Sequence, residues 1–551
     1  MNKKKIWSLS ILSGILLGAS WFSPLTFLIF TALVPLFFLT EEILVNSKRP
    51  KGAVFLFSYI TFVIWNGIDT WWTWFASPGG AVMAVLANSL LMAFTYWVFF
   101  ILYKSIDKRP VDSIQSPLAN RLLHTGYWLL IPIWLSFEYL HTLWELAWTW
   151  LTLGNVFAFQ HNWVQWYEYT GVSGGTLWIL VMNILIFNLL QFKITIPVTF
   201  WSRYRIQIIG LVFVLPVLFS RLLLLTGTSA LNEKRGENIV IVQPNIDPYN
   251  DKFNSTYESQ LNLVYNRVKD KITNETNYLV LPETFFTENV WENNMEQSYS
   301  VKFLRDSILK KYPDLIIITG ATTFYQYKSG EKHSLTAHRY TDVEEYYEVY
   351  NSGLQIDNYG PVKVYHKSKL VPGAERIPYP AIFKPLEKFA IDLGGTVGSL
   401  GTQEERSVLY NKNKSVGVAV VICYESVFGE YVTDYINKGA NLIFIITNDG
   451  WWRDTPGYVQ HLNYARLRAI ETRMPVARCA NTGISCFINE HGEISKETKW
   501  WEPAVIQSTL NPNNNKTFYV KYGDLISKAA LVLALLSVLV VIFISGRKQA
   551  D

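Results

Sequence analysis

The sequence predicts a multi-domain membrane protein, in which an eight-helix α-helical transmembrane bundle carries an α/β domain. Three observations predict this fold. The chain of 551 residues is too long for one ordinary domain. Half of the residues are hydrophobic and only 17% are charged, which excludes a disordered chain. Long apolar stretches lie near both ends of the chain, and the interval between them alternates between strand-like and helix-like patterns.

About 20 mostly apolar residues are needed for a helix to cross the hydrocarbon core of a bilayer. Seven such stretches come first and one follows the long polar interval. They are Ile6–Phe22, Pro24–Thr40, Gly52–Phe75, Gly80–Tyr103, Thr125–Leu143, Gly174–Phe192, Ile206–Thr226 and Leu525–Ser545. The first stretch could instead be a signal peptide, because Lys3, Lys4 and Lys5 precede it. We interpret it as a helix, since a second span follows at once.

These stretches predict three parts, residues 1–226, 227–524 and 525–551. The basic residues predict their orientation. Up to Thr226 there are fourteen Lys and Arg residues, and thirteen of them fall on one side if the spans alternate. Because positive loops stay in the cytoplasm, both termini are expected there and residues 227–524 are expected outside. A net charge of +5 gives no indication of nucleic-acid binding.

Aromatic and acidic residues stand out in the membrane part. Sixteen of the 21 tryptophans precede residue 227, which is typical of an aromatic belt, although a lipid-facing wall beside an outer active site is the alternative. Glu138 lies within the fifth predicted span, with His141 and Glu145 on the same helical face. Acids within a bilayer are costly and often functional. The sequence leaves a functional role and a packing role open for Glu138.

The central part predicts an α/β domain. Its expected strands are Asn238–Val242, Tyr278–Leu281, Leu315–Thr319, Glu348–Ile356, Val416–Ile422 and Leu442–Thr447. Helical periodicity appears between them, at Ser255–Val268 and Gln460–Thr472. Val476–Ala480 and Ile484–Asn489 flank Asn481-Thr482-Gly483 and are expected to form a hairpin. Alternation of strands and helices indicates the α/β class.

Three chemically active side chains follow predicted strands. Glu283 and Lys367 lie just beyond apolar strands, and Cys423 lies between a strand and a helical stretch. The partial positive charge at a helix N-terminus favours a thiolate, which is the nucleophilic form. A carboxylate can move the thiol proton and an ammonium can neutralise an oxyanion, so together they suit acyl transfer. Each residue alone could also be structural, as a loop cap, a surface charge and a buried thiol.

The two other cysteines, Cys479 and Cys486, flank the expected hairpin. A cross-strand disulfide could form in an oxidising compartment. Nothing in the spacing requires one, and we expect free thiols. The three cysteines also lack the spacing of metal ligands.

The three side chains lie in motifs that resemble the nitrilase (carbon–nitrogen hydrolase) superfamily. The motifs are Leu-Pro-Glu283-Thr, Tyr-x-Lys367-x-x-Leu-Val-Pro and Cys423-Tyr-Glu, supported by Thr447-Asn-Asp-Gly-Trp-Trp and Asn481-Thr-Gly-Ile-Ser. With the predicted spans, the whole chain resembles the apolipoprotein N-acyltransferases, a family of bacterial lipoprotein maturation. The resemblance implies a four-layer αββα sandwich on the periplasmic face of the bacterial inner membrane.

The resemblance also implies a reaction. Cys423 would take the sn-1 acyl chain of a phospholipid, typically phosphatidylethanolamine, as a thioester. The α-amino group of a diacylglyceryl-cysteine apolipoprotein would then accept the chain as an amide. Glu283 would be the general base, Lys367 would stabilise the oxyanion, and Glu375 would assist. No cofactor or metal is implied, and a monomer is expected.

Four further residues are expected to contact substrate. Tyr424 and Glu425 match functional positions of the family. Phe253 stands where many members have Trp, and Trp451 either faces substrate or anchors its loop. The loop around Glu375 reads Val-Pro-Gly-Ala-Glu-Arg, where many members have Phe-Gly before the acid, which leaves its shape open.

Two other functions remain open at this point. A membrane-tethered amidase of the nitrilase type would use the same three residues on small amides. A catalytically inactive receptor or scaffold would need none of them. The seven spans before the catalytic part favour a lipid substrate, because such a bundle is costly for an enzyme with a soluble one.

Overall fold

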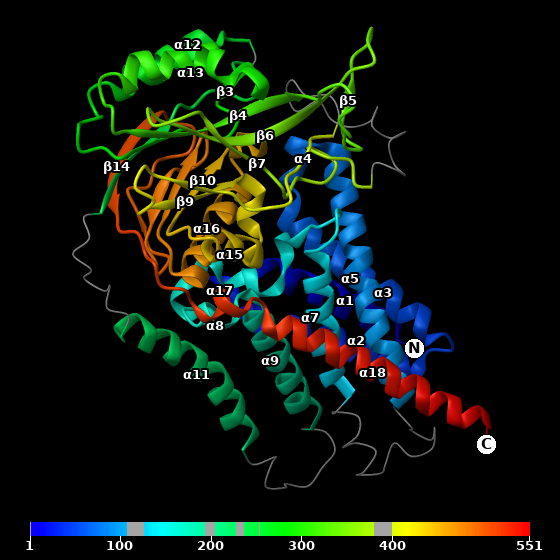
Figure 1. Ribbon diagram of the computed structural model, residues 1–551. Helices are drawn as coiled ribbons and strands as arrows, with labels where there is room; N and C mark the ends of the chain where they lie inside the picture. Colours follow the sequence, from blue (N-terminus) through cyan, green and yellow to red (C-terminus); the bar gives the residue numbers. More distant parts are fainter. Residues whose placement is uncertain are drawn as a thin grey trace. The chain divides into compact units, whose positions relative to one another are not determined.

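A computed structural model of the protein describes residues 2–106, 126–192, 204–226, 236–252, 254–379 and 399–550. The chain forms two compact units. The helical unit comprises Met1–Trp71, Ala81–Gly227 and Asp524–Asp551. The other unit comprises Trp72–Gly80 and Thr228–Gly523, and we call it the catalytic unit because it contains the three residues predicted to be catalytic. Their helices and strands are labelled in Figure 1. The segment Trp72–Gly80, which we predicted to end one span and begin the next, belongs to the catalytic unit.

Within the described part of the chain, six helices are long and apolar enough to cross a membrane. They are Leu25–Asn46, Pro50–Thr70, Pro78–Ser105, Val172–Gln191, Arg205–Thr226 and Leu525–Phe543. The first predicted span forms helix α1 (Lys3–Ala19), of 17 residues. The fifth forms a 3₁₀ turn, η2 (Gly126–Leu129), followed by α7 (Leu130–His141). The predicted count of eight spanning helices is therefore not confirmed.

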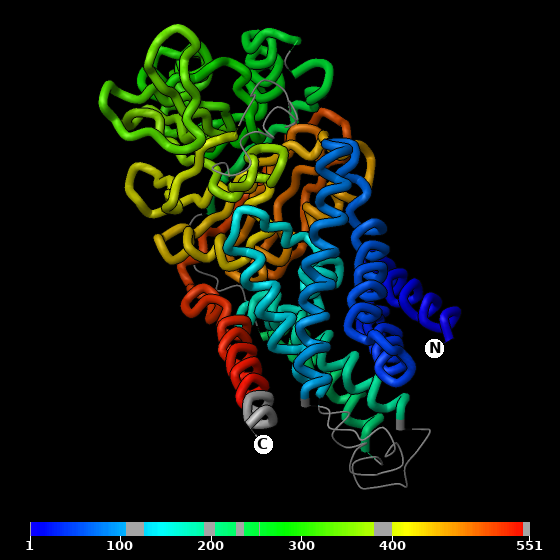
Figure 2. Tube along the Cα trace, turned by 90° about the vertical axis from the view of Figure 1, so that its right-hand side faces the viewer, coloured from blue at the N-terminus to red at the C-terminus, as the bar shows by residue number. Residues whose placement is uncertain are grey.

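Small residues bring α1 close to α3 (Pro50–Thr70) in the helical unit. A Cβ atom on Gly14 would lie 2.7 Å from the carbonyl oxygen of Thr61. The Ser10 hydroxyl donates a hydrogen bond of 2.9 Å to the carbonyl of Phe57. Close backbone approach and hydrogen bonds between helices are typical of packing in membranes. Figure 2 traces α1 in dark blue and α3 in a lighter blue.

Glu138 is buried and hydrogen-bonded within the helical unit. Its carboxylate accepts hydrogen bonds from Trp134 Nε1 at 3.0 Å, from the Leu153 amide at 2.8 Å and from Thr176 Oγ1 at 2.7 Å. These bonds attach the 3₁₀ segment η4 (Leu153–Trp163) and helix α9 (Val172–Phe192) to α7. The predicted common face with Glu145 is wrong, because α7 ends at His141.

The catalytic unit contains two β-sheets. The larger has the strand order β14-β1-β2-β4-β6-β5, with β3 and β7 paired to β4 and β6. Its strands are β1 (Glu237–Gln243), β2 (Tyr278–Val280), β3 (Phe286–Trp291), β4 (Ile316–Gln326), β5 (His338–Arg339), β6 (Tyr346–Ile356), β7 (Lys363–His366) and β14 (Ala504–Leu510). Parallel pairs β1–β2 and β2–β4 are followed by the antiparallel pair β4–β6.

The smaller sheet has the order β13-β12-β11-β10-β9-β8. Its strands are β8 (Val408–Tyr410), β9 (Gly417–Ile422), β10 (Leu442–Thr447), β11 (Val476–Ala480), β12 (Cys486–Ile488) and β13 (Ile494–Ser495). The strands β9, β10 and β11 are parallel and buried along their whole length, which explains their continuous apolar sequences. The antiparallel pair β11–β12 confirms the predicted hairpin.

The two sheets pack face to face between helices. Apolar residues of α12 (Tyr257–Val268) and α13 (Tyr299–Leu304) form one core with the outer face of the larger sheet. A Cβ atom on Gly353 would lie 2.6 Å from Val420, so the two sheets are in direct contact. Helices α15 (Gly429–Asn437) and α16 (Pro456–Thr472) cover the smaller sheet. Figure 1 shows these layers, which confirm the predicted αββα sandwich.

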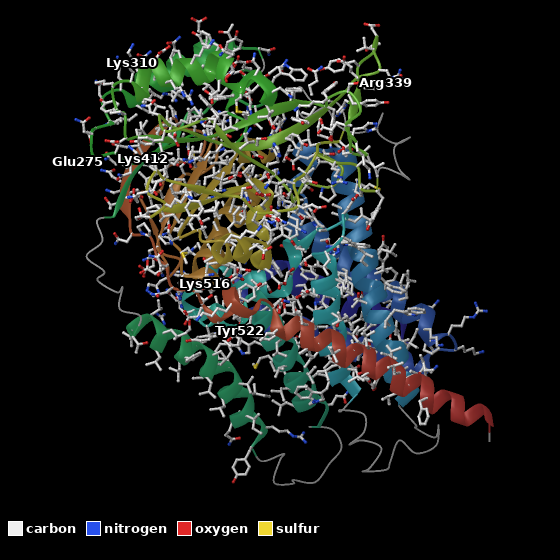
Figure 3. The ribbon with its side chains drawn as sticks, in the orientation of Figure 1. Glu275, Lys310, Arg339, Lys412, Lys516 and Tyr522 are labelled. Atoms are coloured by element: carbon white, nitrogen blue, oxygen red, sulfur yellow. The ribbon has the colours of Figure 1, made fainter. Side chains whose placement is uncertain are left out.

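The outer surface of the sandwich is charged. Lys310, Arg339 and Lys412 are exposed on it and are labelled in Figure 3. Glu283, Lys367 and Cys423, by contrast, are all buried inside the catalytic unit.

Candidate active site

Cys423 occupies a sharp turn at the end of β9. It begins the 3₁₀ turn η8 (Cys423–Val427), and its φ angle of 49° lies in the left-handed region, which is uncommon for residues other than glycine. The side chain is only 8% exposed. Backbone strain of this kind is concentrated at active sites. The expected α-helix starts only at Gly429, so Cys423 does not lie at an α-helix N-terminus.

Glu283 follows β2 and is held by three donors. Its Oε1 atom accepts hydrogen bonds from Asn351 Nδ2 at 2.8 Å and from Lys367 Nζ at 3.0 Å, and its Oε2 atom accepts one from the Asn448 amide at 3.1 Å. Burial alone would raise the pKa of Glu283, but the Lys367 charge and these hydrogen bonds lower it below the usual range. Glu283 is therefore ionised at neutral pH, as a general base must be.

A glycine allows the Glu283 turn to form. A Cβ atom on Gly320 of β4 would lie 2.6 Å from the Glu283 Cα atom and 2.4 Å from the Thr284 nitrogen. Any larger residue at position 320 would push the carboxylate away from its donors.

Lys367 follows β7 and lies between two carboxylates. Its Nζ atom is 3.0 Å from Glu283 Oε1 and 2.7 Å from Glu375 Oε1. Burial would lower the pKa of Lys367, but the charges of Glu283 and Glu375 raise it well above the usual range. The second oxygen of Glu375 accepts a hydrogen bond from the Val371 amide at 2.8 Å, which fixes the loop that we could not define from sequence. Lys367 is thus a permanent cation inside the site.

The electrostatics of Cys423 differ from the sequence expectation. Burial and the Glu283 charge raise the pKa of the thiol well above its usual value, and they outweigh the opposing effect of Lys367. Burial therefore dominates at this position over the stabilisation of a thiolate that we expected from a helix N-terminus. A neutral thiol requires a base to remove its proton. Glu283 is ionised and its charge acts on the Cys423 thiol, so Glu283 can be this base.

Two functional neighbours were missed from the sequence. Asn351, in β6, donates to both Glu283 Oε1 and Glu375 Oε1, at 2.8 and 3.0 Å. Lys252 is buried in the loop after β1, and its charge acts on Glu283. Asn351 gave no distinct signal, because its strand also contains Glu348, Ser352 and Gln355. Nothing in the spacing indicated Lys252.

Glu425 has a different position from the one expected of a substrate contact. It is fully buried, and its oxygens accept hydrogen bonds from the Ile422 and Ser368 amides, at 2.8 and 2.7 Å, and from the Tyr365 and Tyr431 hydroxyls, both at 2.6 Å. One carboxylate thereby joins the backbone before Cys423 to the backbone after Lys367. Glu425 is a positioning residue for both.

A buried network of polar and charged side chains forms hydrogen bonds with the backbone of the Cys423 turn. Nε2 of His461 lies 3.1 Å from the Cys423 carbonyl oxygen and 2.9 Å from Ser426 Oγ, and Nδ1 lies 3.0 Å from Asp449 Oδ1. Asp449 also pairs with Arg478 at 2.6 Å. Burial opposes ionisation, but Arg478 and His461 lower the pKa of Asp449. His461 therefore helps to hold the turn that carries the nucleophile.

Three other residues were predicted to contact the substrate, namely Tyr424, Trp451 and Phe253. Tyr424 is buried, and its ring meets that of Phe428 edge-on at 5.1 Å. Trp451 is half-buried, and its carbonyl accepts a hydrogen bond of 2.6 Å from the Tyr249 hydroxyl. Phe253 lies outside the described residues.

The other cysteines are free, as expected. The Cys479 thiol donates to the carbonyl of Val242 at 3.2 Å. Cys486 lies opposite Arg478 in the β11–β12 pair, so the two cysteines are not directly paired across the hairpin. Burial raises the pKa of both thiols, as it does for Cys423, but the charges that act on them come from Arg478, Arg466 and Glu497 and not from a carboxylate paired with a buried lysine.

Two family models match the chain. Residues 239–517 match the carbon-nitrogen hydrolase family, and residues 13–185 match the N-terminal domain of apolipoprotein N-acyltransferases. The apolipoprotein N-acyltransferase of Chlorobaculum tepidum is 28% identical, over 96% of this chain and 95% of its own. That of Thermotoga maritima is 24% identical, over 98% and 97%.

Among solved structures, Nit3 of Saccharomyces cerevisiae, a nitrilase-superfamily member, matches 50% of this chain and 91% of its own, at 17% identity and a TM-score of 0.37. The family matches confirm the predicted resemblance and indicate a membrane-bound N-acyltransferase of bacterial lipoprotein biosynthesis. The chain belongs to the carbon-nitrogen hydrolase family, as a member that also carries the N-terminal membrane domain of the apolipoprotein N-acyltransferases.

Proposed function

We propose that the protein transfers the sn-1 acyl chain of a phospholipid to the α-amino group of a diacylglyceryl-cysteine apolipoprotein, through a thioester on Cys423. The single observation that carries this proposal is a buried cluster in which Lys367 Nζ lies 3.0 Å from Glu283 and 2.7 Å from Glu375, with the charges of Glu283 and Lys367 acting on the buried Cys423 thiol. This combination provides a nucleophile, its base and an oxyanion partner.

In the first half-reaction, Glu283 removes the proton from the Cys423 thiol as the sulfur attacks the ester carbonyl. Lys367 stabilises the negative charge that develops on the carbonyl oxygen. When the tetrahedral intermediate collapses, Glu283 returns the proton to the departing lysophospholipid oxygen. The thioester and a lysophospholipid result.

In the second half-reaction, the acceptor amine attacks the thioester carbonyl. Glu283 takes a proton from the attacking nitrogen, and Lys367 again faces the oxyanion. Collapse of this intermediate releases the Cys423 sulfur, which recovers the proton from Glu283, and the acyl chain leaves as an amide. The proposal makes Glu375 the residue that orients Lys367, through its contact of 2.7 Å.

Several finer assignments belong to the same proposal. The acyl donor is phosphatidylethanolamine, and the enzyme acts as a monomer. The chain consists of three parts, residues 1–226, 227–524 and 525–551. The eight predicted apolar stretches, including those around α1 and α7, all cross the membrane. Phe253, Tyr424 and Trp451 bind the substrate, whereas Glu425 acts by positioning Cys423.

A label-transfer experiment tests this function against its alternative. The purified enzyme is incubated with phospholipid labelled in the sn-1 chain and with an apolipoprotein. We expect the label on the lipoprotein amine and an equal amount of lysophospholipid. Label that appears only as free fatty acid would indicate hydrolysis, and an unchanged phospholipid would indicate a scaffold, so either result would contradict the proposal.

We also propose that both termini are cytoplasmic and that the catalytic unit is periplasmic, at the bacterial inner membrane. The support is the absence of Lys and Arg from the predicted outer connections, at Ser23, Ser77–Gly79 and Glu145–Ser173. A reporter that is active only in the periplasm should be active when fused after Thr226 and inactive when fused at Asp551. Activity with the opposite pattern would contradict this orientation.

A further inference from the structure

Thr447 places a buried hydroxyl group beside the side chain of Cys423. It is the last residue of β10, which pairs in parallel with β9 so that Ile446 lies opposite Ile422. The residues that follow these two are Thr447 and Cys423, and both are buried. A side-chain hydrogen bond joins them. The hydroxyl of Thr447 is therefore a direct neighbour of the sulfur that we propose as the nucleophile.

The same hydroxyl is also hydrogen-bonded to a carboxylate. Thr447 Oγ1 donates a hydrogen bond of 2.8 Å to Asp449 Oδ1. A threonine hydroxyl has one proton to donate and two lone pairs that accept. Because its proton is directed at Asp449, the Thr447 oxygen has a lone pair left for the proton of the Cys423 thiol. In the resting site the hydrogen bonds thus run from the thiol to Thr447 and from Thr447 to Asp449.

Asp449 has two further partners that hold it as an anion. His461 Nδ1 lies 3.0 Å from Asp449 Oδ1, and Arg478 Nη2 donates a hydrogen bond of 2.6 Å to Asp449 Oδ2. Burial would raise the pKa of Asp449, but the charges of Arg478 and His461 lower it below its usual range. The carboxylate therefore stays ionised and hydrogen-bonded when the Thr447 hydroxyl turns away from it.

The backbone at the end of β10 is fixed, and it also contacts the proposed base. The Thr447 carbonyl accepts a hydrogen bond of 3.0 Å from the Asn481 amide. The next residue, Asn448, donates its backbone amide to Glu283 Oε2 at 3.1 Å. Since neither neighbour leaves the backbone room to move, the Thr447 side chain can respond to a change at Cys423 by rotation of its O–H bond alone.

We propose that Thr447 is a further catalytic residue, whose hydroxyl accepts a hydrogen bond from the Cys423 thiol at rest and turns to donate one to the sulfur when the thiol proton leaves for Glu283. The proton passes from sulfur to the carboxylate, and no bond to the Thr447 oxygen breaks. A hydrogen bond to an ionised group is stronger than one to a neutral group, so this contact favours the thiolate. The inference rests on the proposed function, because it takes Cys423 as the nucleophile.

The test measures alkylation of Cys423 by iodoacetamide in the full-length enzyme without phospholipid, by mass spectrometry of the peptide that contains it. Thr447→Val keeps the shape of the side chain but removes the hydroxyl, and it should slow alkylation by about tenfold, as expected for one lost hydrogen bond to a charged group. Thr447→Ser keeps the hydroxyl and loses a methyl group, and it should react at close to the wild-type rate. Thr433→Val is the matched control, because the buried Thr433 hydroxyl donates to the Glu430 carbonyl at 2.7 Å instead. It should leave alkylation unchanged.

The two Thr447 variants separate the hydroxyl from packing, because a packing effect would slow Thr447→Ser more than Thr447→Val. If thermal unfolding shows that Thr447→Val does not fold, Thr447→Ala lacks the same hydroxyl and carries the same expectation, with Thr433→Ala as its control. A wild-type rate in Thr447→Val, an equal loss in Thr447→Ser or an equal loss in Thr433→Val would overturn the inference. Failure of the proposed function would show instead as the expected alkylation pattern without acyl transfer from phospholipid.

Discussion

Cys423→Ala is expected to abolish acyl transfer, with a loss on the order of 10⁶-fold, as is typical when a covalent nucleophile is removed. The physical reason is that no other cysteine can replace it. The charges of Glu283 and Lys367 act on the Cys423 thiol, whereas those that act on Cys479 and Cys486 come from Arg478, Arg466 and Glu497, and the Cys479 thiol is already hydrogen-bonded to a backbone carbonyl. The measurement is the rate of label transfer from phospholipid to apolipoprotein.

Cys479→Ala and Cys486→Ala serve as matched controls. Each removes one buried thiol from the same sheet, so any general cost of losing a sulfur atom should appear in them as well. Both should retain acyl transfer and differ from the wild type mainly in stability, by about 1 to 2 kcal/mol for a small buried side chain. Transfer that persists in Cys423→Ala, or is lost in either control, would show that the nucleophile is assigned wrongly.

Glu283→Gln and Lys367→Met are expected to fail in both half-reactions, but with different pH responses. A positioned base contributes about 10²–10⁴-fold, and one oxyanion donor about 10²–10³-fold. The pKa of Cys423 is raised, so the thiol is neutral at pH 7 and a base is needed. Raising the pH generates thiolate directly and should partly rescue thioester formation in Glu283→Gln. It should not rescue Lys367→Met, which lacks a positive charge.

Single-turnover thioester formation across a pH series separates these two roles. Because Glu283 and Lys367 are paired at 3.0 Å, each substitution leaves one buried charge without a partner. Thermal unfolding of both variants is therefore the necessary control for folding. Equal rescue of both variants, or of neither, would mean that the base and the oxyanion partner have been assigned wrongly.

The strands that the sequence predicts well are those buried on both faces. β10 (Leu442–Thr447) is continuously apolar and was predicted with the same limits. β5 and β13 have two residues each and were missed, because a pair of residues carries no periodicity. The segment Trp72–Gly80 was read as the edges of two spans, since hydropathy does not reveal that Trp72 packs on Trp452, with ring centroids 4.7 Å apart.

The sequence predicts those site residues that come directly after an apolar strand. It predicts the other residues of the site only in part. Glu283, Lys367 and Cys423 each follow a strand or the turn after it, and the structure brings their charges together. The protonation of Cys423 was not predictable, because it depends on burial and on Glu283, which is 140 residues away in the sequence. Asn351 and Lys252 were missed for the same reason: their partners come from other parts of the chain.

Mass spectrometry of the enzyme after exposure to phospholipid tests the central claim most directly. In the absence of an apolipoprotein acceptor, the peptide containing Cys423 should gain the mass of one acyl chain, and hydroxylamine should remove it as a thioester. Addition of apolipoprotein should discharge the same peptide as the lipoprotein gains the chain. An enzyme that transfers acyl chains while Cys423 stays unmodified, or that carries the chain on another residue, would contradict this account.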